Sequence, residues 1–134
     1  MRRILLGFFT ALALGGAVAA QGDGDAQEVI DAQIEAFLRD DVAEAFTYAS
    51  PGIRRLFGTA ENFGAMVRQG YPMVWRPAER RYLQSEGAGT QQRQIVQIVD
   101  AEGRLHLLEY DMIATERGWR IDGVRILQAP DLGV

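Results

Sequence analysis

The sequence has no cysteine, no lysine and a single histidine, and each of these gaps excludes a class of site. Without cysteine, lipid attachment as a bacterial lipoprotein is excluded, and His106 alone cannot supply the usual ligands of structural zinc. Without lysine there is no phosphate-binding Gly-Lys-Ser/Thr loop and no amine for a Schiff base. The only serines, Ser50 and Ser85, lie outside any Gly-x-Ser-x-Gly pattern. The sequence therefore predicts no metal site and no cofactor.

The chain is also acidic, with a net charge of −4. All 14 basic residues are arginines, set against 18 acidic residues. The arginines are scattered, and the pairs Arg54-Arg55 and Arg80-Arg81 are interpreted as solvated or ion-paired. An acidic chain without a basic stripe argues against nucleic acid or an anionic membrane as the main partner.

Residues 1–20 have the layout of a secretory signal peptide. A positive start at Arg2 and Arg3 precedes an uncharged, mostly apolar run and a stretch of small residues ending at Ala20. We expect cleavage after Ala20, with cleavage after Ala19 as the alternative, and a periplasmic or secreted protein with no membrane association afterwards. The apolar run is shorter than the roughly 20 residues that span a bilayer, which disfavours a retained anchor.

The rest of the chain is the size of one small domain. We expect a flexible lead-in over 21–25, a single domain over 26–128 and a tail over 129–134. Apolar residues at helical spacing predict a helix over 26–39, capped by Asp25. Two more helices are expected over 42–48 and 60–69, whereas 53–57 is expected to form at most one helical turn.

Residues 71–77 form a predicted loop of unusual composition. Met73, Val74 and Trp75 stand between two prolines, and such large apolar groups are costly to leave in water. One interpretation is a plug that seals one end of the core. The other is the lip of a ligand pocket, where aromatic residues and an arginine are common.

The last third of the chain predicts four β-strands, at 80–87, 91–99, 104–115 and 119–128, joined by glycine-bearing turns. The predicted fold class is α+β, with the N-terminal helices packed on a strongly curved four-stranded antiparallel sheet. Strand three is apolar on both faces, with Leu107 on one and Tyr110 on the other, so both faces should be covered. Helices in so short a chain can cover one face only. A homodimer through the outer sheet face, or the sheet's own curl, would cover the other.

In strand four, a one-residue bulge at Asp122-Gly123 would place Trp119, Ile121, Val124 and Ile126 on one face. Pairing across a Glu116-Arg117-Gly118 loop would then point Glu109 and Asp111 into the helix-covered interior. Burial there would raise their pKa values and suit them to act as a base. Alternatively, both acids are structural ion-pair members, with Arg93 available to Asp111, or Arg125 to Glu109 if there is no bulge.

The segments Ser50-Pro51-Gly52-Ile53, Phe57-Gly58-Thr59, Asn62-Phe63 and 66–71 (Met-Val-Arg-Gln-Gly-Tyr), with the closing 118–124 (Gly-Trp-Arg-Ile-Asp-Gly-Val), carry a resemblance to a known family. They resemble the bacterial domain of unknown function 4864 family, within the nuclear transport factor 2-like (cystatin-like, ketosteroid isomerase-like) superfamily. The resemblance covers roughly residues 26–128. It implies helices lying in the hollow of a curved sheet, the cystatin-like cone, in a superfamily of both enzymes and non-catalytic binding proteins.

Two functions stay open at this point. The first is a non-catalytic exported domain that binds a small apolar or amphipathic ligand or a protein partner, with Tyr48, Tyr71, Trp75, Arg93 and Trp119 as candidate ligand-binding residues. A structural role in the cell envelope is hard to separate from it. The second is an acid–base enzyme of the isomerase, dehydratase or hydrolase type. Its candidate catalytic residues are Asp111, Glu109 and Tyr110.

Overall fold

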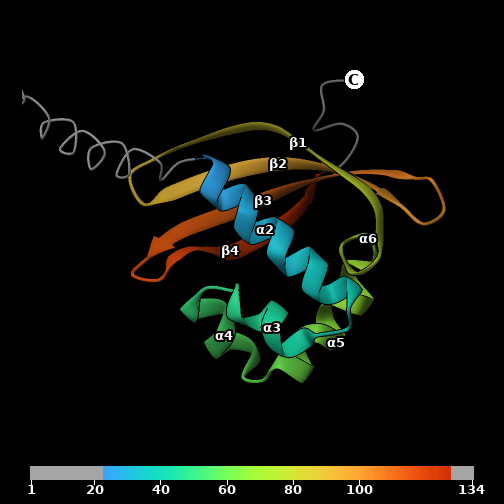
Figure 1. Ribbon diagram of the computed structural model, residues 1–134, viewed down its shortest axis with the longest axis horizontal. Helices are drawn as coiled ribbons and strands as arrows, with labels where there is room; N and C mark the ends of the chain where they lie inside the picture. The colour runs from blue at the N-terminus through green and yellow to red at the C-terminus, as the bar shows by residue number, and fades with distance from the viewer. Residues whose placement is uncertain (1–22, 128–134) are drawn as a thin grey trace, which may run out of the picture.

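The computed structural model describes residues 23–127; the predicted signal peptide and the tail after 128 lie outside the described residues. The elements in order are α2 (Asp23–Leu38), α3 (Val42–Thr47), α4 (Pro51–Phe57), α5 (Ala60–Gly70), α6 (Pro72–Trp75), β1 (Pro77–Ala88), β2 (Gln91–Asp100), β3 (Leu105–Thr115) and β4 (Gly118–Leu127). The strands form one sheet in the order β1-β2-β3-β4, and every neighbouring pair is antiparallel. Helix α2 crosses one face of this sheet, and α3, α4 and α5 gather at one side of it (Figure 1). The predicted α+β class is confirmed.

Helix α2 supplies more buried apolar residues than any other described helix. Ile30, Ile34 and Phe37 are fully buried, as their helical spacing predicts. Burying each such side chain stabilises the fold by about 1.5–3 kcal/mol. The helix begins at Asp23, so Asp25 is inside it rather than its cap, and residues 23–25 are not part of a flexible lead-in.

The short helices α4 and α6 differ from expectation. Ser50 does not end the preceding helix: its hydroxyl accepts from the Ile53 N–H at 3.2 Å and caps α4, with Pro51 in the first turn. A polar cap followed by proline is favourable for starting a helix, which explains why α4 reaches seven residues instead of one turn.

The predicted 71–77 loop contains α6, and its apolar residues are buried. Met73, Val74 and Trp75 are all in the core, with the Trp75 ring 5.4 Å from that of Phe37. The Arg76 guanidinium donates to the Phe37 carbonyl at 2.8 Å and so satisfies the end of α2. The segment therefore acts as the plug, although Tyr71 and Val74 also face the cavity described below.

Strand β4 contains the predicted bulge. Met112 pairs with Ile121 and Asp111 with Gly123, so Asp122 is an extra residue with no partner on β3. Trp119 and Ile121 then share the inner face with Val124 and Ile126. On that face Val124 pairs with Tyr110 and Ile126 with Leu108. The bulge prediction is confirmed.

The turn between β3 and β4 is one residue shorter than expected. Thr115 pairs with Gly118, which has a φ of 109°, so only Glu116 and Arg117 lie between the strands. Because successive side chains point to opposite faces, one residue of register moves every side chain of β3 to the other face. The prediction that Glu109 and Asp111 point into the interior is therefore wrong: the inner face of β3 carries Leu108, Tyr110 and Met112.

A second irregularity lies in β1, between Tyr82 and Ser85. The fully buried Gln94 on β2 faces it and donates to the Leu83 carbonyl at 3.1 Å, while Gln27 of α2 donates to Gln94 Oε1 at 3.1 Å. Gln94 therefore supplies a hydrogen bond to a backbone carbonyl group that the interrupted ladder leaves without a strand partner.

The bulge in β4 is fixed from outside the sheet. The Ser50 N–H donates to the Ile121 carbonyl at 2.8 Å and the Ile121 N–H to the Tyr48 carbonyl at 2.9 Å, which pairs this edge with the 48–50 segment. The Ser50 hydroxyl also donates to Asp122 Oδ1 at 2.7 Å. One buried serine thus holds both the start of α4 and the bulged residue.

We expect Ser50→Ala to lower the free energy of unfolding by about 2 kcal/mol, because it removes a helix cap and a buried hydrogen bond together. The matched control is Thr59→Ala, which removes only the cap of α5, where the Thr59 hydroxyl accepts from the Asn62 N–H at 3.1 Å. That change should cost about 1 kcal/mol. Urea denaturation measures both free energies of unfolding. Equal decreases in the two variants would show that the Ser50–Asp122 hydrogen bond contributes nothing to stability.

Candidate functional site

An apolar cavity of about 250 Å³ lies between the helices and the inner face of the sheet. We call it the cone cavity. Its lining is Gln33 and Phe37 from α2, Ala49, Ile53, Leu56 and Phe57 on and before α4, Phe63, Met66 and Val67 from α5, Tyr71 and Val74, and Tyr110, Ile121, Gly123 and Val124 from the sheet. None of these residues carries a charge. Leu56, whose exposed fraction is 72%, marks where the cavity meets solvent.

Tyr110 supplies a polar group that nothing satisfies. Its side chain is fully buried, and its hydroxyl has no hydrogen-bond partner among residues 23–127. Burial raises the pKa of Tyr110; Arg80 opposes this rise and Tyr71 adds to it. The phenol therefore keeps its proton at physiological pH and can donate a hydrogen bond. Leaving a buried hydroxyl unpaired costs about 1–3 kcal/mol, so this donor is an exception that needs an explanation.

Tyr110 was predicted as a catalytic residue, and the predicted ligand-binding residues are spread over the molecule. Tyr71 does line the cone cavity, and its hydroxyl donates to the Val124 carbonyl at 3.0 Å. Trp119 is buried on the inner face with an unpartnered indole N–H, but it is not part of the cavity lining, and neither is Trp75. The Tyr48 hydroxyl donates outside the cavity, to Glu44 at 3.0 Å.

The sequence reasoning missed most of the helical lining. Phe63, Met66 and Val67 stand at helical spacing on α5, and this pattern is equally typical of packed core, so it does not identify them as a cavity wall. Ile53 and Phe57 were overlooked because their segment was expected to be a single turn. The signal available was the Ser50-Pro51 start of a longer helix.

Glu109 lies on the outer face of the sheet in an ion-pair network. Arg125 Nη2 is 2.5 Å from Glu109 Oε1, and Arg93 Nε is 3.6 Å from Glu109 Oε2. Arg93 also pairs with Glu86 at 2.9 Å. Arg125 therefore opposes Glu109 with the bulge present, contrary to the expectation that the two would meet only without it. The interpretation of Glu109 as a structural ion-pair member is the one its contacts support.

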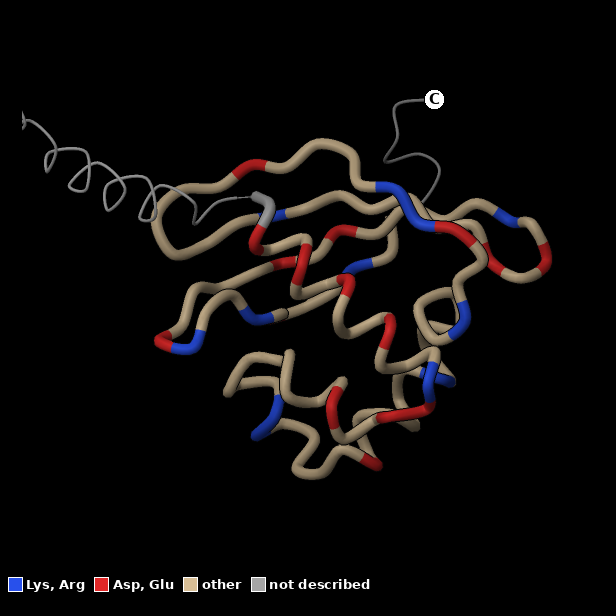
Figure 2. Tube along the Cα trace, in the orientation of Figure 1, with Lys and Arg blue, Asp and Glu red and all other residues tan. Residues whose placement is uncertain are grey.

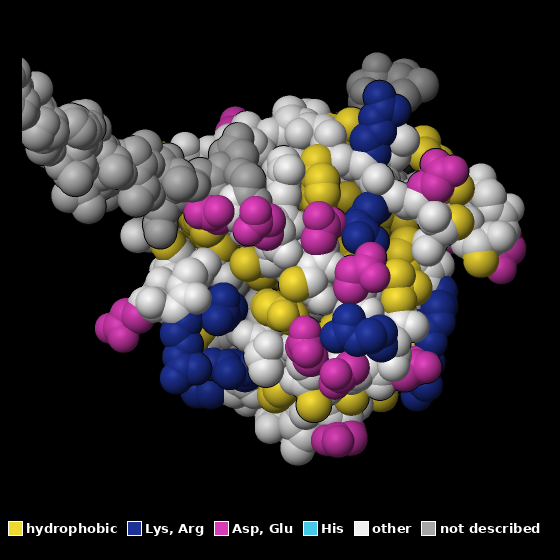
Figure 3. Space-filling view, in the orientation of Figure 1, with side chains coloured by type: hydrophobic (Ala, Val, Ile, Leu, Met, Phe, Trp, Pro, Cys, Tyr) yellow, Lys and Arg dark blue, Asp and Glu magenta, His cyan; other side chains and the backbone are white. Residues whose placement is uncertain are grey.

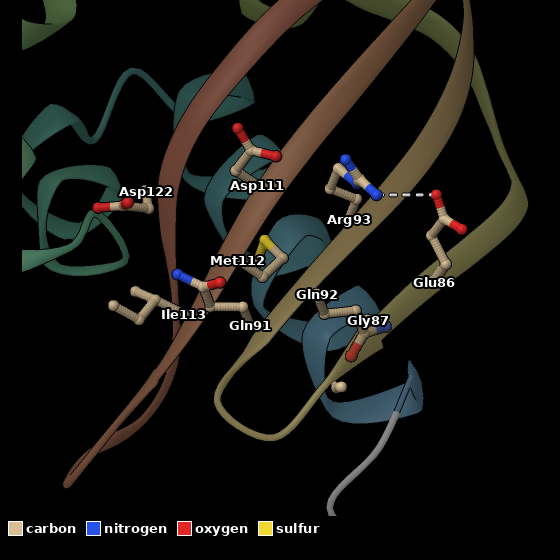
Figure 4. A pocket seen from close by; sticks show the side chains of 10 residues that line it. Glu86, Gly87, Gln91, Gln92, Arg93, Asp111, Met112, Ile113 and Asp122 are labelled. Atoms are coloured by element: carbon tan, nitrogen blue, oxygen red, sulfur yellow. Dashed lines mark hydrogen bonds and ion pairs between the residues drawn. The ribbon is translucent and has the colours of Figure 1, made fainter.

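Asp111 shares that face without a hydrogen bond or ion pair of its own among the described residues. It pairs with Gly123 on one side and Arg93 on the other. Together with Glu86, Arg93 and Asp122 it lines an open polar hollow of about 460 Å³ (Figure 4). Burial and the nearby Glu109 raise the pKa of Asp111. The cations Arg93 and Arg125 lower it, but the pKa of Asp111 is raised overall.

The outer face also carries apolar side chains, interspersed with polar ones such as Gln97, which pairs with Leu107. Ile95 and Leu107 are partly buried there, and Leu105 is 58% exposed. Acidic and basic residues are interspersed along the described chain (Figure 2). The predicted homodimer through this face stays a prediction.

Neither a metal centre nor a membrane span appears in the part of the chain that the structure describes. Over residues 23–127, no three His, Cys, Asp or Glu side chains are grouped to hold a metal ion. No helix in that range combines the length and the apolar character needed to cross a bilayer.

Comparison with known proteins gives a family and a fold. A family model described as a domain of unknown function (DUF4864) matches residues 19–134. A solved SEC-C motif containing protein from Rhodopseudomonas palustris is similar at 16% identity and a TM-score of 0.50, over 70% of this chain and 72% of that one. At such identity the likeness concerns the fold alone.

Two further structures show weaker likeness at the same 16% identity. A protein from Kribbella flavida has a TM-score of 0.49 over 78% of this chain and 87% of its own. An NTF2-like protein of unknown function from Burkholderia pseudomallei has a TM-score of 0.37 over 77% of this chain and 89% of its own. No curated protein matches the sequence.

We expect Asp111→Asn to stabilise the protein at pH 7. Folding raises the pKa of Asp111, so the folded protein holds this proton more tightly than the unfolded chain does. Ionisation therefore lowers the free energy of unfolding as the pH rises through the folded pKa. The asparagine variant escapes that loss, and its advantage should disappear as the pH falls into the acid range.

The control is Glu109→Gln, which loses its ion pairs and should be less stable than the parent at pH 7. Urea denaturation of both variants between pH 3 and pH 7 checks the two signs. A destabilised Asp111→Asn at neutral pH would contradict the assignment of Asp111 to an unpaired position.

Proposed function

We propose that this protein, which belongs to the family described as a domain of unknown function (DUF4864), binds a small, uncharged, largely apolar molecule in the cone cavity. The observation that carries this proposal is the buried Tyr110 hydroxyl, which has no partner among the described residues while its side chain lines an apolar cavity. A ligand with one hydrogen-bond acceptor would satisfy that hydroxyl. Apolar pockets with a few convergent polar groups are the usual form of small-molecule sites.

The size of the cavity limits the ligand. An apolar cavity of about 150 Å³ in another protein is large enough for benzene. A volume of about 250 Å³ therefore suits a molecule with one or two rings, or a short chain of similar bulk. Among residues 23–127, the cavity lining contains no carboxylate, histidine or arginine, so a charged ligand group would lose its hydration there without gaining a counter-charge.

The cavity favours binding over acid–base catalysis. The two carboxylates considered as bases, Asp111 and Glu109, lie on the other face of the sheet. The only titratable groups that the described part of the chain places in the cavity lining are the phenols of Tyr71 and Tyr110, and burial keeps Tyr110 protonated. A binding protein needs no base in this position, whereas an isomerase or dehydratase does.

We expect Tyr110→Phe to separate ligand binding from stability. Removing an unpaired buried hydroxyl should raise the free energy of unfolding of the free protein by about 1 kcal/mol. The same change should weaken binding of acetophenone, which has a carbonyl acceptor, by roughly tenfold. Binding of ethylbenzene, which is similar in shape but has no acceptor, should be unchanged or stronger.

NMR titration of the two probes, with Tyr48→Phe as the control outside the cavity, measures these effects. Equal acetophenone affinity in the parent and in Tyr110→Phe would remove the role given to this hydroxyl. Failure of the parent protein to bind either probe would contradict the proposed function.

We also propose that the protein acts outside the cytoplasm, supported by the charge and apolar pattern of residues 1–20. Mass spectrometry of the protein purified from its own cells should find a mature chain that begins at Gln21, or at Ala20 if the alternative cut is used. A chain that retains Met1 in the soluble cytoplasmic fraction would overturn this.

A further inference from the structure

Three arginines from different segments line one hollow on the surface, away from the cone cavity. Arg54 comes from α4, Arg117 from the β3–β4 turn and Arg120 from β4. The hollow has a volume of about 250 Å³, and Pro51, Thr115 and Glu116 complete its lining. Arginine side chains crowd the surface at this end of the molecule, between α4 and the β3–β4 turn (Figure 3). We call it the arginine hollow.

No ion pair of these arginines is found within the described chain. Arg80, Arg93 and Arg125 each hold a carboxylate within 3 Å, but over residues 23–127 none of the three arginines of the hollow forms an ion pair. Burial lowers the pKa of Arg120, and the nearby Arg54 and Arg117 lower it further. Arg54 and Arg117 are thus each close enough to Arg120 to repel it, in a chain whose overall charge is negative.

Other roles account for only part of this arrangement. Arg54 lies in the last turn of α4, where a cation is favoured by the helix dipole. Arg120 donates to the carbonyl of its neighbour Trp119 at 2.8 Å, which occupies one of its N–H groups. Neither contact explains why Arg117 and Arg120 converge on Arg54, or what offsets the repulsion among them.

We propose that the arginine hollow binds a phosphate group, as inorganic phosphate or a phosphomonoester. Guanidinium groups present paired N–H donors that match the oxygens of such anions, and they bind them more specifically than ammonium groups do. The three arginines and Glu116 together leave two excess positive charges, which a dianion would neutralise. The site is separate from the cone cavity, so the two proposals stand or fall independently.

The first test is a titration with inorganic phosphate at constant ionic strength, followed by the NMR signals of the arginine side-chain N–H groups. We expect saturable binding that perturbs Arg54, Arg117 and Arg120 together. Arg120→Gln should weaken it roughly tenfold, because a charged hydrogen-bond donor is lost. Arg81→Gln is the matched control: Arg81 is exposed on β1, at the opposite edge of the sheet.

A second variant should strengthen binding and so cannot be explained by damage to the fold. Glu116 is the one carboxylate in the lining, and Glu116→Gln should tighten phosphate binding roughly twofold to fivefold. The control is Glu79→Gln, an exposed acid on β1. Equal effects of the paired variants, or titration without saturation, would overturn the proposal in favour of non-specific attraction.

A third binding experiment distinguishes whether the phosphate group belongs to a soluble molecule or to a lipid. Glycerol 3-phosphate and vesicles containing phosphatidic acid present the same headgroup, free in solution or in a bilayer. Binding of glycerol 3-phosphate without vesicle binding indicates a soluble phosphomonoester. Vesicle binding that inorganic phosphate displaces indicates a lipid headgroup, and vesicle binding that phosphate does not displace contradicts the site.

Discussion

The structure depends on the extra residue at Asp122. If β4 paired regularly through Asp122, without the bulge, Ile121 and Val124 would point to opposite faces, and one of them would be lost from the core. With it, the inner face stays apolar along the whole strand while the sheet bends around the helices. Ser50 holds the bulge through the Asp122 carboxylate and begins α4 with the same hydroxyl. The curvature of the sheet and the helix that closes the cavity are therefore fixed at one point.

Among the described residues, that arrangement leaves two interior side-chain groups without a hydrogen bond, and the Tyr110 hydroxyl is the one on a residue that lines the cone cavity. Gln94 and Gln33 are also buried, but both have hydrogen-bond partners: Gln94 donates to Leu83 and Gln33 to the Ala45 carbonyl at 3.1 Å. Tyr110 has none among residues 23–127, and Trp119 is the only other described side chain with such a buried atom. Buried polar groups are normally paired, and an unpaired donor beside an apolar cavity is what a binding site looks like before its ligand enters.

The sequence predicted the positions of the helices and strands better than it predicted which face of the sheet each strand residue points to. The α2 stripe and the bulge at Gly123 followed from apolar spacing, and both were right. The position of Glu109 and Asp111 was wrong because it required the exact length of the Glu116-Arg117 turn, and one residue decides which face a whole strand presents. The cone cavity combines side chains from α2, α4, α5 and the sheet, and apolar periodicity cannot distinguish a wall of a cavity from packed core. The arginine hollow depends likewise on α4 meeting the distant β3–β4 hairpin, and no local pattern predicts it.

Thiol labelling measures the face of each residue directly, because the chain has no cysteine of its own. Ile121 and Arg125 lie four residues apart, so an uninterrupted strand would place them on the same face. The bulge places them on opposite faces, with exposed fractions of 5% for Ile121 and 63% for the Arg125 side chain. Single variants Ile121→Cys and Met112→Cys should react with a thiol reagent only on global unfolding, whereas Arg125→Cys and Asp111→Cys should react at once. Similar rates at 121 and 125, or a protected cysteine at 111, would contradict the account.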